Sequence, residues 1–314
     1  MLGRSANGIY WMARNLERAE NTARLLDVGF RMALTRGAQA AKEEWRSVLV
    51  TIGQDLDYRA RFDEHTGPQV FNFILRGPDN PASVLAMVEN ARTNARAVRT
   101  AITREVWEAT NECWMALRDL LARPVRESNI GEVLTMIRRQ TTQVRGAMDG
   151  TMLRNEIFNF ARIGTFIERA DNTARILDVK YYVLLPSVAW VGSSLDNAQW
   201  ETVLRSVAGD RAYRWLNAGS MDSRGIAEFL ILDGRFPRSL TFCYAKLRSN
   251  LGGLSRQHGL ETAAHGLLRE AGSRLHETTI DAIFERGLHE FITEFIADTL
   301  LIGEAIAADY RFIE

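Results

Sequence analysis

Cysteine is scarce in this chain, which has Cys113 and Cys243 as its two thiols among 314 residues. Zinc sites need several cysteines or histidines at close spacing, and disulfide-based scaffolds need several cysteine pairs. Neither pattern occurs here. A protein with so few thiols fits a reducing compartment. We therefore expect a cytoplasmic protein that has no disulfide framework.

Proline and strand-like sequence are also scarce. The chain has six prolines and almost no stretch in which apolar and polar residues alternate, as they do in half-buried strands. The longest apolar run, Tyr181 to Gly192, is interrupted by Pro186 and is too short to span a bilayer. The first residues lack the apolar core of a signal peptide. These absences predict an all-α protein with no membrane partner.

An excess of charge of one sign is missing as well. Lysine plus arginine and aspartate plus glutamate each number 39, so the formal net charge is zero. A nucleic-acid-binding protein usually carries a basic excess, and we expect no nucleic-acid partner. Arginine far exceeds lysine. Base composition of the genome can cause such a bias, but arginine is also the residue suited to internal ion pairs and to carboxylate or phosphate contacts.

What the chain does contain is a long internal repeat. Glu17–Val28 and Glu168–Val179 are identical at ten of twelve positions and begin 151 residues apart. The two differences, Glu20 against Asp171 and Leu25 against Ile176, preserve charge and apolar character. Such self-similarity indicates a duplicated structural unit. We predict two repeats, residues 1–150 and 151–314, packed as one body.

Each copy of the repeated stretch is expected to form an amphipathic helix. Glu17, Glu20 and Arg24 fall on one face, opposite the apolar residues. One interpretation is a solvated charged face, but an exposed pair at i,i+4 contributes only about 0.2–0.5 kcal/mol and does not require the same residues twice. We therefore predict that both polar faces are buried or line a cleft. The candidate site residues are Arg14, Glu17, Arg18, Glu20, Asn21 and Arg24 in the first copy, and Glu168, Arg169, Asp171, Asn172 and Arg175 in the second.

The remaining sequence predicts helices throughout. Further matches, Trp45 with Trp200 and the pair Pro81 and Ser83 with Pro237 and Ser239, extend the repeat. The predicted helices cover residues 6–35, 43–61, 70–75, 84–102, 106–121 and 130–148, then 240–254, 261–275 and 280–311, with a hinge at 146–151. The fold class is all-α, a single helical bundle of two five- or six-helix halves related by a pseudo-two-fold axis. Such an axis would bring the two repeated helices together.

The stretch from Tyr10 to Asp27 resembles the signature of the alpha-E family, bacterial all-helical proteins with a Glu-Arg motif. The resemblance covers essentially the whole chain. It implies a context beside, or fused to, a circularly permuted ATP-grasp ligase, often with a transglutaminase-like peptidase or a proteasome-like hydrolase nearby. It therefore implies a system that makes or processes a small peptide or amide. The chain departs from the family at Thr165, where an arginine is common and where Arg14 stands in the first copy.

Three interpretations of the repeated motif remain open. In the first, Arg18, Arg24, Arg169 and Arg175 hold a peptide carboxylate or acyl phosphate while Glu17 or Glu168 acts as general base. In the second, the chain is a non-catalytic scaffold or partner of the ligase, and the motif is a buried ion-pair lattice. In the third, paired carboxylates bind Mg²⁺ and a pyrophosphate. Arginines on the same face argue against a metal, so we expect no metal and no cofactor.

Overall fold

The described residues of the protein are almost entirely helical. A computed structural model describes residues 3–34, 38–182, 194–217 and 222–312. These residues form fifteen α-helices, and no strand occurs among them, which confirms the all-α fold class. None of the described helices combines the length and the apolar character needed to cross a bilayer. Most of the apolar run from Tyr181 to Gly192 lies outside the described residues.

The chain forms two compact units, Met1–Gly164 and Thr165–Glu314. The boundary falls within one helix, α8, which runs from Glu156 to Tyr182. The division into repeats after residue 150 and the pseudo-two-fold axis remain predictions.

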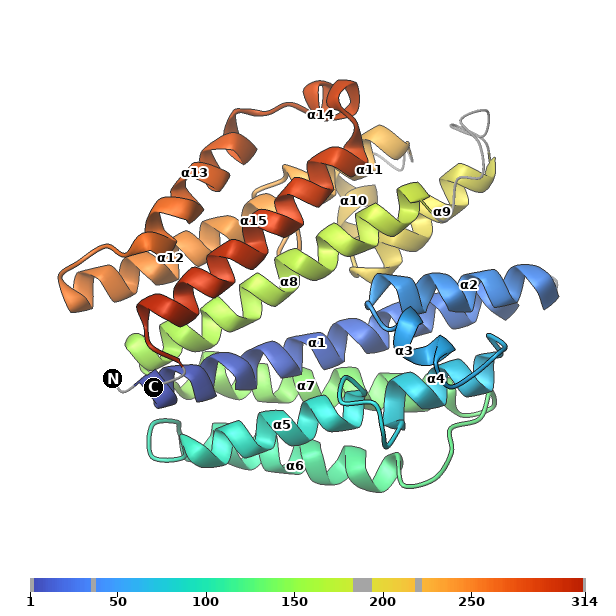
Figure 1. The fold of residues 1–314 in the computed structure, drawn as a ribbon, viewed down its shortest axis with the longest axis horizontal. Coiled ribbons are helices and arrows are strands. Elements are labelled where there is room, and N and C mark those ends of the chain that lie inside the picture. The colour runs from blue at the N-terminus through green and yellow to red at the C-terminus, as the bar shows by residue number, and fades with distance from the viewer. Residues whose placement is uncertain (1–2, 35–37, 183–193, 218–221, 313–314) are drawn as a thin grey trace. The chain divides into compact units, whose positions relative to one another are not determined.

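The first unit is built around four long helices. Helix α1 (Gly3–Leu34) packs against α5 (Val84–Ala97) and α7 (Ile130–Thr151), and α6 (Arg104–Leu120) packs against both of these. Figure 1 shows α5 and α6 running side by side, with α7 beside α1. Three shorter helices continue this unit: α2 (Ala38–Thr51) packs on α1, and α3 (Asp55–Arg59) and α4 (Gly67–Arg76) pack on α2. The result is a four-helix bundle centred on α1.

The second unit has helices in a similar order. After α8 come α9 (Ser194–Ser206), α10 (Asp210–Leu216), α11 (Ser223–Ile231), α12 (Leu240–His258), α13 (Ala263–Glu277), α14 (Ile280–Arg286) and α15 (Leu288–Asp309). Helix α13 packs against α12 and α15. Helix α8 reaches α12, because the rings of Phe166 and Phe242 lie 6.0 Å apart. Helix α14 lies where the first unit has only the connection between α6 and α7.

Serine side chains begin the matching helices α5 and α12. Ser83 accepts a hydrogen bond from the backbone N–H of Ala86, and Ser239 accepts one from that of Phe242. An N-cap of this kind satisfies a backbone donor that has no partner within the helix. The helix starts predicted from the two proline and serine motifs are confirmed.

Two glycines interrupt helices that the sequence analysis predicts to be continuous. The helix predicted over 43–61 is wrong: it is two helices, because Gly53 adopts a φ of +72° between α2 and α3. The helix predicted over 280–311 is likewise divided into α14 and α15 at Gly287, which has a φ of +107°. Positive φ is readily adopted by glycine and ends a helix. The predicted hinge at 146–151 is also wrong, since these residues lie in α7.

Equivalent aromatic residues are buried in both units. Trp45 and Trp200 are each 4% exposed, and Tyr58 and Tyr213 are almost completely buried. The segment 70–75, whose pattern alone also fits a strand, lies in helix α4, and its prediction as a short helix is confirmed. At Gly164 the start of α8 comes so close to α1 that a Cβ atom would overlap the backbone oxygen of Tyr10. Glycine therefore permits this contact within the first unit.

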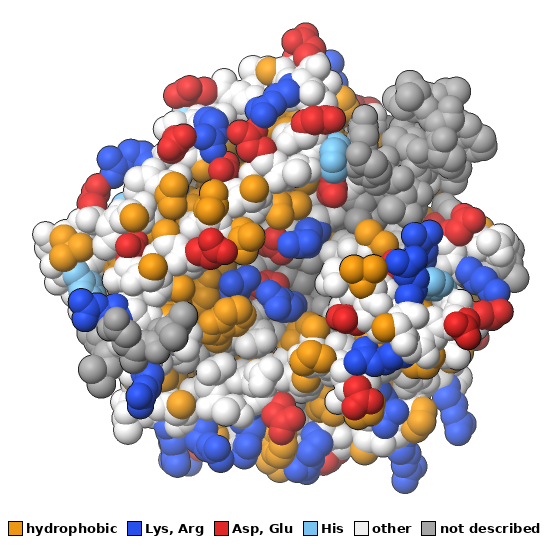
Figure 2. Space-filling model, viewed as in Figure 1, with side chains coloured by type: hydrophobic (Ala, Val, Ile, Leu, Met, Phe, Trp, Pro, Cys, Tyr) orange, Lys and Arg blue, Asp and Glu red, His pale blue; other side chains and the backbone are white. Residues whose placement is uncertain are grey.

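The surface of the described residues mixes both signs of charge. Figure 2 shows acidic and basic side chains interspersed across one face, with apolar side chains between them. Exposed ion pairs such as Arg104–Glu108 and Arg274–Glu270 occur among the described residues. Exposed pairs of this type contribute little to folding stability.

Candidate functional site

The polar face of α1 is buried. Glu17 and Asn21 are each 3% exposed and Glu20 is completely buried. The apolar face of the same helix, including Ala19, Ala23 and Leu26, is also buried. The prediction that this polar face points inward is confirmed for the first copy. The chemical role of these residues stays a prediction.

Two arginines hold the Glu20 carboxylate. Arg24, one turn further along α1, donates from Nε and Nη2 to Oε1 at 3.0 and 2.8 Å. Arg145 on α7 donates from Nη1 to Oε2 at 2.5 Å. Both oxygens of a fully buried carboxylate are thus engaged by charged donors. Such charge-assisted bonds are about twice as strong as neutral ones, and they join α1 to α7.

Glu17 shares one of these arginines. Its Oε2 lies 3.4 Å from Nη1 of Arg145, which is longer than the bond that this nitrogen makes to Glu20. Arg145 also donates from Nη2 to the hydroxyl of Thr142, which orients its guanidinium. We call Glu17, Glu20, Arg24 and Arg145 the α1–α7 ion-pair cluster. It buries two carboxylates beside two arginines that remain about one quarter exposed.

A second contact between the same helices lies two turns further along α1. Asp27 accepts a hydrogen bond from Arg138 of α7 at 2.9 Å and another from Arg31 of α1 at 3.1 Å. The side chain of Arg31 is 69% exposed, whereas those of Asp27 and Arg138 are 17% and 26% exposed. The contact between Asp27 and Arg138 is therefore the better shielded of the two.

The remaining candidates of the first copy lie at the edge of this face. Arg14 donates to the hydroxyl of Tyr10 at 3.2 Å, and its guanidinium lies 4.7 Å from the ring centroid of Trp11. This arginine therefore packs on aromatic rings as well as carrying charge. Arg18 is partly buried.

The second copy is buried differently. Glu168 is 3% exposed and Arg169 is 6% exposed. Arg169 donates to the backbone oxygen of Pro237 at 3.3 Å, and the Thr173 hydroxyl donates to that of Arg238 at 2.9 Å. These bonds fasten α8 to the segment that precedes α12. The arginine that the sequence analysis places in substrate binding thus contacts the backbone of its own unit.

The remaining polar residues of α8 are more exposed than their counterparts on α1. Arg175 donates to Asp171 at 2.7 Å, and their side chains are 43% and 21% exposed. Burial of the guanidinium opposes its charge, but the hydrogen bond and charge of Asp171, with Glu168 and Asp178 nearby, outweigh it and raise the pKa of Arg175. Asn172 is partly exposed. This copy therefore presents a looser pair than Glu20 with Arg24.

Helix α15 corresponds to α7, because both are 22 residues long and their bounds lie 158 residues apart. Asp178, the counterpart of Asp27, lies 2.5 Å from Nδ1 of His289 on α15. Helix α15 contains no arginine or lysine. The aspartate contact therefore recurs with a different partner, whereas the arginine that contacts both α1 glutamates has no basic counterpart.

The sequence analysis missed Asp27, Arg138, Arg145, Asp178 and His289. Both aspartates lie inside the repeated stretch, so their recurrence was a usable signal. Arg138 and His289 occupy different positions in the last long helix of each half, so the repeat does not relate them. Arg145 gives no such signal because α15 contains no arginine. The predicted proximity of Glu17, Glu20 and Arg24 to Glu168, Asp171 and Arg175 remains a prediction.

The motif fits a metal ion poorly. Mg²⁺ prefers free carboxylate oxygens and water as ligands. Both oxygens of Glu20 already accept bonds from arginine, and Asp171 accepts one from Arg175. Within the described part of the chain, no group of three or more histidine, cysteine, aspartate or glutamate residues is placed to hold a metal ion. The donor set favours ion pairing over Mg²⁺ coordination.

Comparison with known proteins extends over nearly the whole chain. The Alpha-E family model, described as "A predicted alpha-helical domain with a conserved ER motif", matches residues 1–310. "Uncharacterized protein Mb2597" of Mycobacterium bovis is 24% identical over 94% of this chain. "Uncharacterized protein Rv2567" of Mycobacterium tuberculosis is 23% identical over the same share. The chain spans 35% of the length of each relative. No solved structure matches it.

Proposed function

The chain belongs to the Alpha-E family, and we propose that it is a helical partner protein in a bacterial amide-forming or peptide-processing system. In this proposal it acts in the cytoplasm with a circularly permuted ATP-grasp ligase, and a transglutaminase-like peptidase belongs to the same system. The ligase binds ATP and activates the carboxyl group. The helical partner supplies a folded surface, and its repeated motif stabilises the helices that form this surface.

The observation that carries this non-catalytic role is the burial of the carboxylates that could act as general bases. Glu17 and Glu168 are each 3% exposed, and Oε2 of Glu17 lies 3.4 Å from Nη1 of Arg145. A general base must reach its substrate within hydrogen-bond distance. The neighbouring Glu20 is completely buried and accepts bonds from Arg24 and Arg145, so these charges serve ion pairing. Removing one member of such a buried pair costs about 3–5 kcal/mol.

The relatives are consistent with a partner role. About two thirds of each matched mycobacterial protein lies outside the matched region, because this chain spans 35% of its length. Additional chain of that extent leaves room for a catalytic domain beside the helical one. The identity of the ligase rests on the family resemblance of the Glu-Arg motif.

Co-expression with the neighbouring ATP-grasp ligase tests the proposal. The full chain is co-purified with the ligase, and ATP consumption and amide products are measured. Glu17→Gln is compared with Glu89→Gln, which changes an exposed glutamate on α5. We expect the ligase to co-purify and both folded variants to support the wild-type rate.

Two results would contradict the proposal in different ways. A ligase that does not co-purify with the wild-type chain contradicts the partnership. A Glu17→Gln variant that is folded and bound to the ligase but forms no product contradicts the non-catalytic role. That second result would favour Glu17 as a general base and the arginines as substrate ligands.

A further inference from the structure

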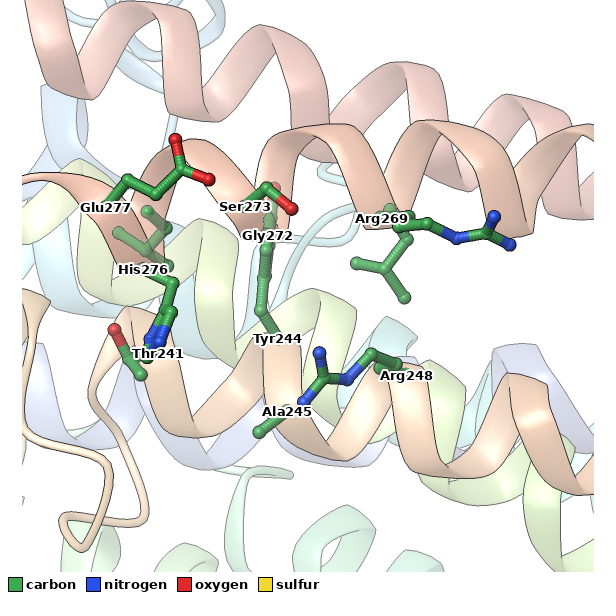
Figure 3. A pocket seen from close by; sticks show the side chains of 11 residues that line it. Thr241, Tyr244, Ala245, Arg248, Arg269, Gly272, Ser273, His276 and Glu277 are labelled. Carbon is green, nitrogen blue, oxygen red and sulfur yellow. The ribbon is translucent and has the colours of Figure 1, made fainter.

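A pocket opens between α12 and α13 of the second unit. It has a volume of about 180 Å³ and is lined by Tyr244, Arg248, Arg269, Gly272 and His276, among others. Figure 3 shows the Arg248 guanidinium directed into the space between the two helices, whereas that of Arg269 points away. Arg269 is paired with Glu261. A cavity of about 150 Å³ is large enough to bind benzene, so this pocket can hold an aromatic ring.

The first unit fills the corresponding space with its own ring. Arg92 is the repeat counterpart of Arg248. Its guanidinium lies 4.1 Å from the ring centroid of Trp114, and its Nε donates to Asn111 at 2.7 Å. Arg118 lies over the same ring at 4.6 Å. Arg92 thus has an aromatic ring and an acceptor oxygen as partners.

Spacing along α6 and α13 identifies the residues that replace these partners. The buried residues Cys113 and Leu117 correspond to Ala271 and Leu275. Counted from them, Trp114 is replaced by Gly272. By the same count, Arg269 replaces Asn111 and His276 replaces Arg118. Arg248 lines the pocket together with Arg269, Gly272 and His276. The pocket is therefore equivalent to the site around Arg92, but it lacks the tryptophan ring and the asparagine oxygen.

The side of the pocket that carries Arg248 and His276 receives no ligand from the described residues. Among the described residues, no hydrogen-bond or ion-pair partner is found for Arg248 or His276, and neither packs on an aromatic ring. Glu277 lies at the end of the pocket that carries His276 (Figure 3). Its charge repels an anion at that end and leaves Arg248 as the favoured position for a carboxylate.

Gly272 keeps the pocket open. Its φ is not positive, and a Cβ atom at this position would meet no atom within 4 Å. Neither backbone conformation nor close packing requires a glycine here. A glycine within a helix is less favourable than an alanine. Its structural effect is therefore to leave room beside Arg248.

We propose that this pocket binds an aromatic carboxylate, such as the C-terminal phenylalanine or tyrosine of a peptide. The ring occupies the space that Trp114 fills in the first unit and stacks against the Arg248 guanidinium. The carboxylate accepts two parallel hydrogen bonds from the same guanidinium, whose planar fork matches it. This site is separate from the repeated motif, and its test does not require the ligase.

Binding of N-acetyl-L-tyrosine to the full chain, followed by isothermal titration calorimetry, tests the proposal. We expect Arg248→Gln to weaken binding at least tenfold and Gly272→Trp to abolish it by filling the pocket. Arg92→Gln, the matched change in the first unit, should leave affinity unchanged. N-acetyl-L-tyrosine amide, which has no carboxylate, should bind at least tenfold more weakly than the acid.

Several outcomes would overturn the proposal. The first is that the wild-type chain does not bind N-acetyl-L-tyrosine at millimolar concentration. The second is that Gly272→Trp binds it as tightly as the wild-type chain does. The third is that Arg92→Gln and Arg248→Gln lose the same amount of affinity. Equal affinity for the acid and the amide would show that the carboxylate does not contribute to binding. If Gly272→Trp does not fold, the single variants Gly272→Ala and Arg248→Gln still test the proposal. Gly272→Ala should fold and bind the ligand as the wild-type chain does, whereas Arg248→Gln should bind it more weakly.

Discussion

His289 of α15 and Asp178 of α8 form a contact in which Nδ1 lies 2.5 Å from Oδ1. Nε2 of the same ring lies 3.3 Å from the Thr293 hydroxyl, so the imidazole is held at both nitrogens. In the first unit, Asp27, the counterpart of Asp178, meets Arg138. The repeated aspartate thus joins α8 to α15 through a histidine and α1 to α7 through an arginine.

Disruption of this contact should cost a measurable but modest stability. Both side chains are more than one fifth exposed, so solvent screens the interaction. We expect His289→Ala and Asp178→Ala each to lower the free energy of unfolding by about 1 kcal/mol. The double variant should lose about 0.5–1 kcal/mol less than the sum. Urea denaturation measures all three, with the exposed Arg31→Ala as a control. Strict additivity would show that the two residues do not interact.

The two copies of the motif should respond very differently to neutralisation. Glu20→Gln leaves Arg24 and Arg145 without their buried carboxylate, and we expect a loss of about 3–5 kcal/mol. Asp171→Asn removes one partly exposed partner of Arg175, and we expect a loss of at most about 1 kcal/mol.

Urea unfolding of the two variants at one pH makes this comparison. Arg145→Met provides a third measurement, because it removes the shared arginine and keeps much of its length. It should also be strongly destabilising, since it leaves Glu17 and Glu20 less well compensated. Equal, small losses for Glu20→Gln and Asp171→Asn would mean that the α1–α7 ion-pair cluster contributes nothing to stability.

The glycines between helices should tolerate alanine poorly. Gly53 and Gly287 have positive φ values, which are strained for a residue with a Cβ atom. We expect Gly53→Ala and Gly287→Ala to lower the melting temperature, each costing about 1–2 kcal/mol. Gly146 is the matched control: it lies inside α7 with open space around it, so Gly146→Ala should raise stability by up to about 1 kcal/mol. A change in stability of the same sign in all three variants would contradict this explanation.

The fold should lose stability at alkaline pH. Burial raises the pKa of the Cys113 thiol and that of the Tyr58 hydroxyl, each to about 12. An unfolded thiol ionises near pH 8.5 and an unfolded tyrosine near pH 10. Above these values the unfolded state loses protons that the native state keeps, so rising pH favours unfolding. The stabilisation is complete below about pH 8.5 and declines as pH approaches 12.

Urea midpoints measured between pH 8 and pH 11 test this effect. We expect the midpoint to fall with pH, and we expect the fall to be less steep in Cys113→Ala, whatever its absolute stability. Tyr58→Phe, which also removes the hydrogen bond to the Glu64 backbone oxygen, should reduce the slope above pH 10. An unchanged slope in both variants would show that these groups do not titrate as burial requires.

Local sequence signals predicted the elements that depend on local physics. The periodic apolar residues of α1 and the serine caps of α5 and α12 act within a few positions, and the sequence located them correctly. The helix ends at Gly53 and Gly287 were missed because a single glycine inside a periodic pattern does not reveal its φ. A backbone conformation of this kind depends on what surrounds the residue.

Partners distant in sequence were the harder part of the site. The burial of Glu17 and Glu20 could be predicted because their residue types recur where a solvated face would not require them. Arg145, which lies 125 residues beyond Glu20, could not be identified. Its position follows from how α7 packs on α1, and the matching helix α15 contains no arginine. The repeat also hides the α12–α13 pocket, because a glycine in place of Trp114 is visible only as an absence.

The presence of Arg145 in α7, and of no arginine or lysine in α15, has a consequence for how the chain avoids misfolding. A protein with two similar halves risks exchanging equivalent helices during folding, and such misassembly is a typical failure of repeat proteins. If α15 took the position of α7, no arginine or lysine would face the carboxylates that Arg145 now holds, because α15 contains neither. A buried charge without its partner is costly. The arginine thus makes the native order of helices more stable than the exchanged one, and near-identity of the repeated stretches does not make the halves interchangeable.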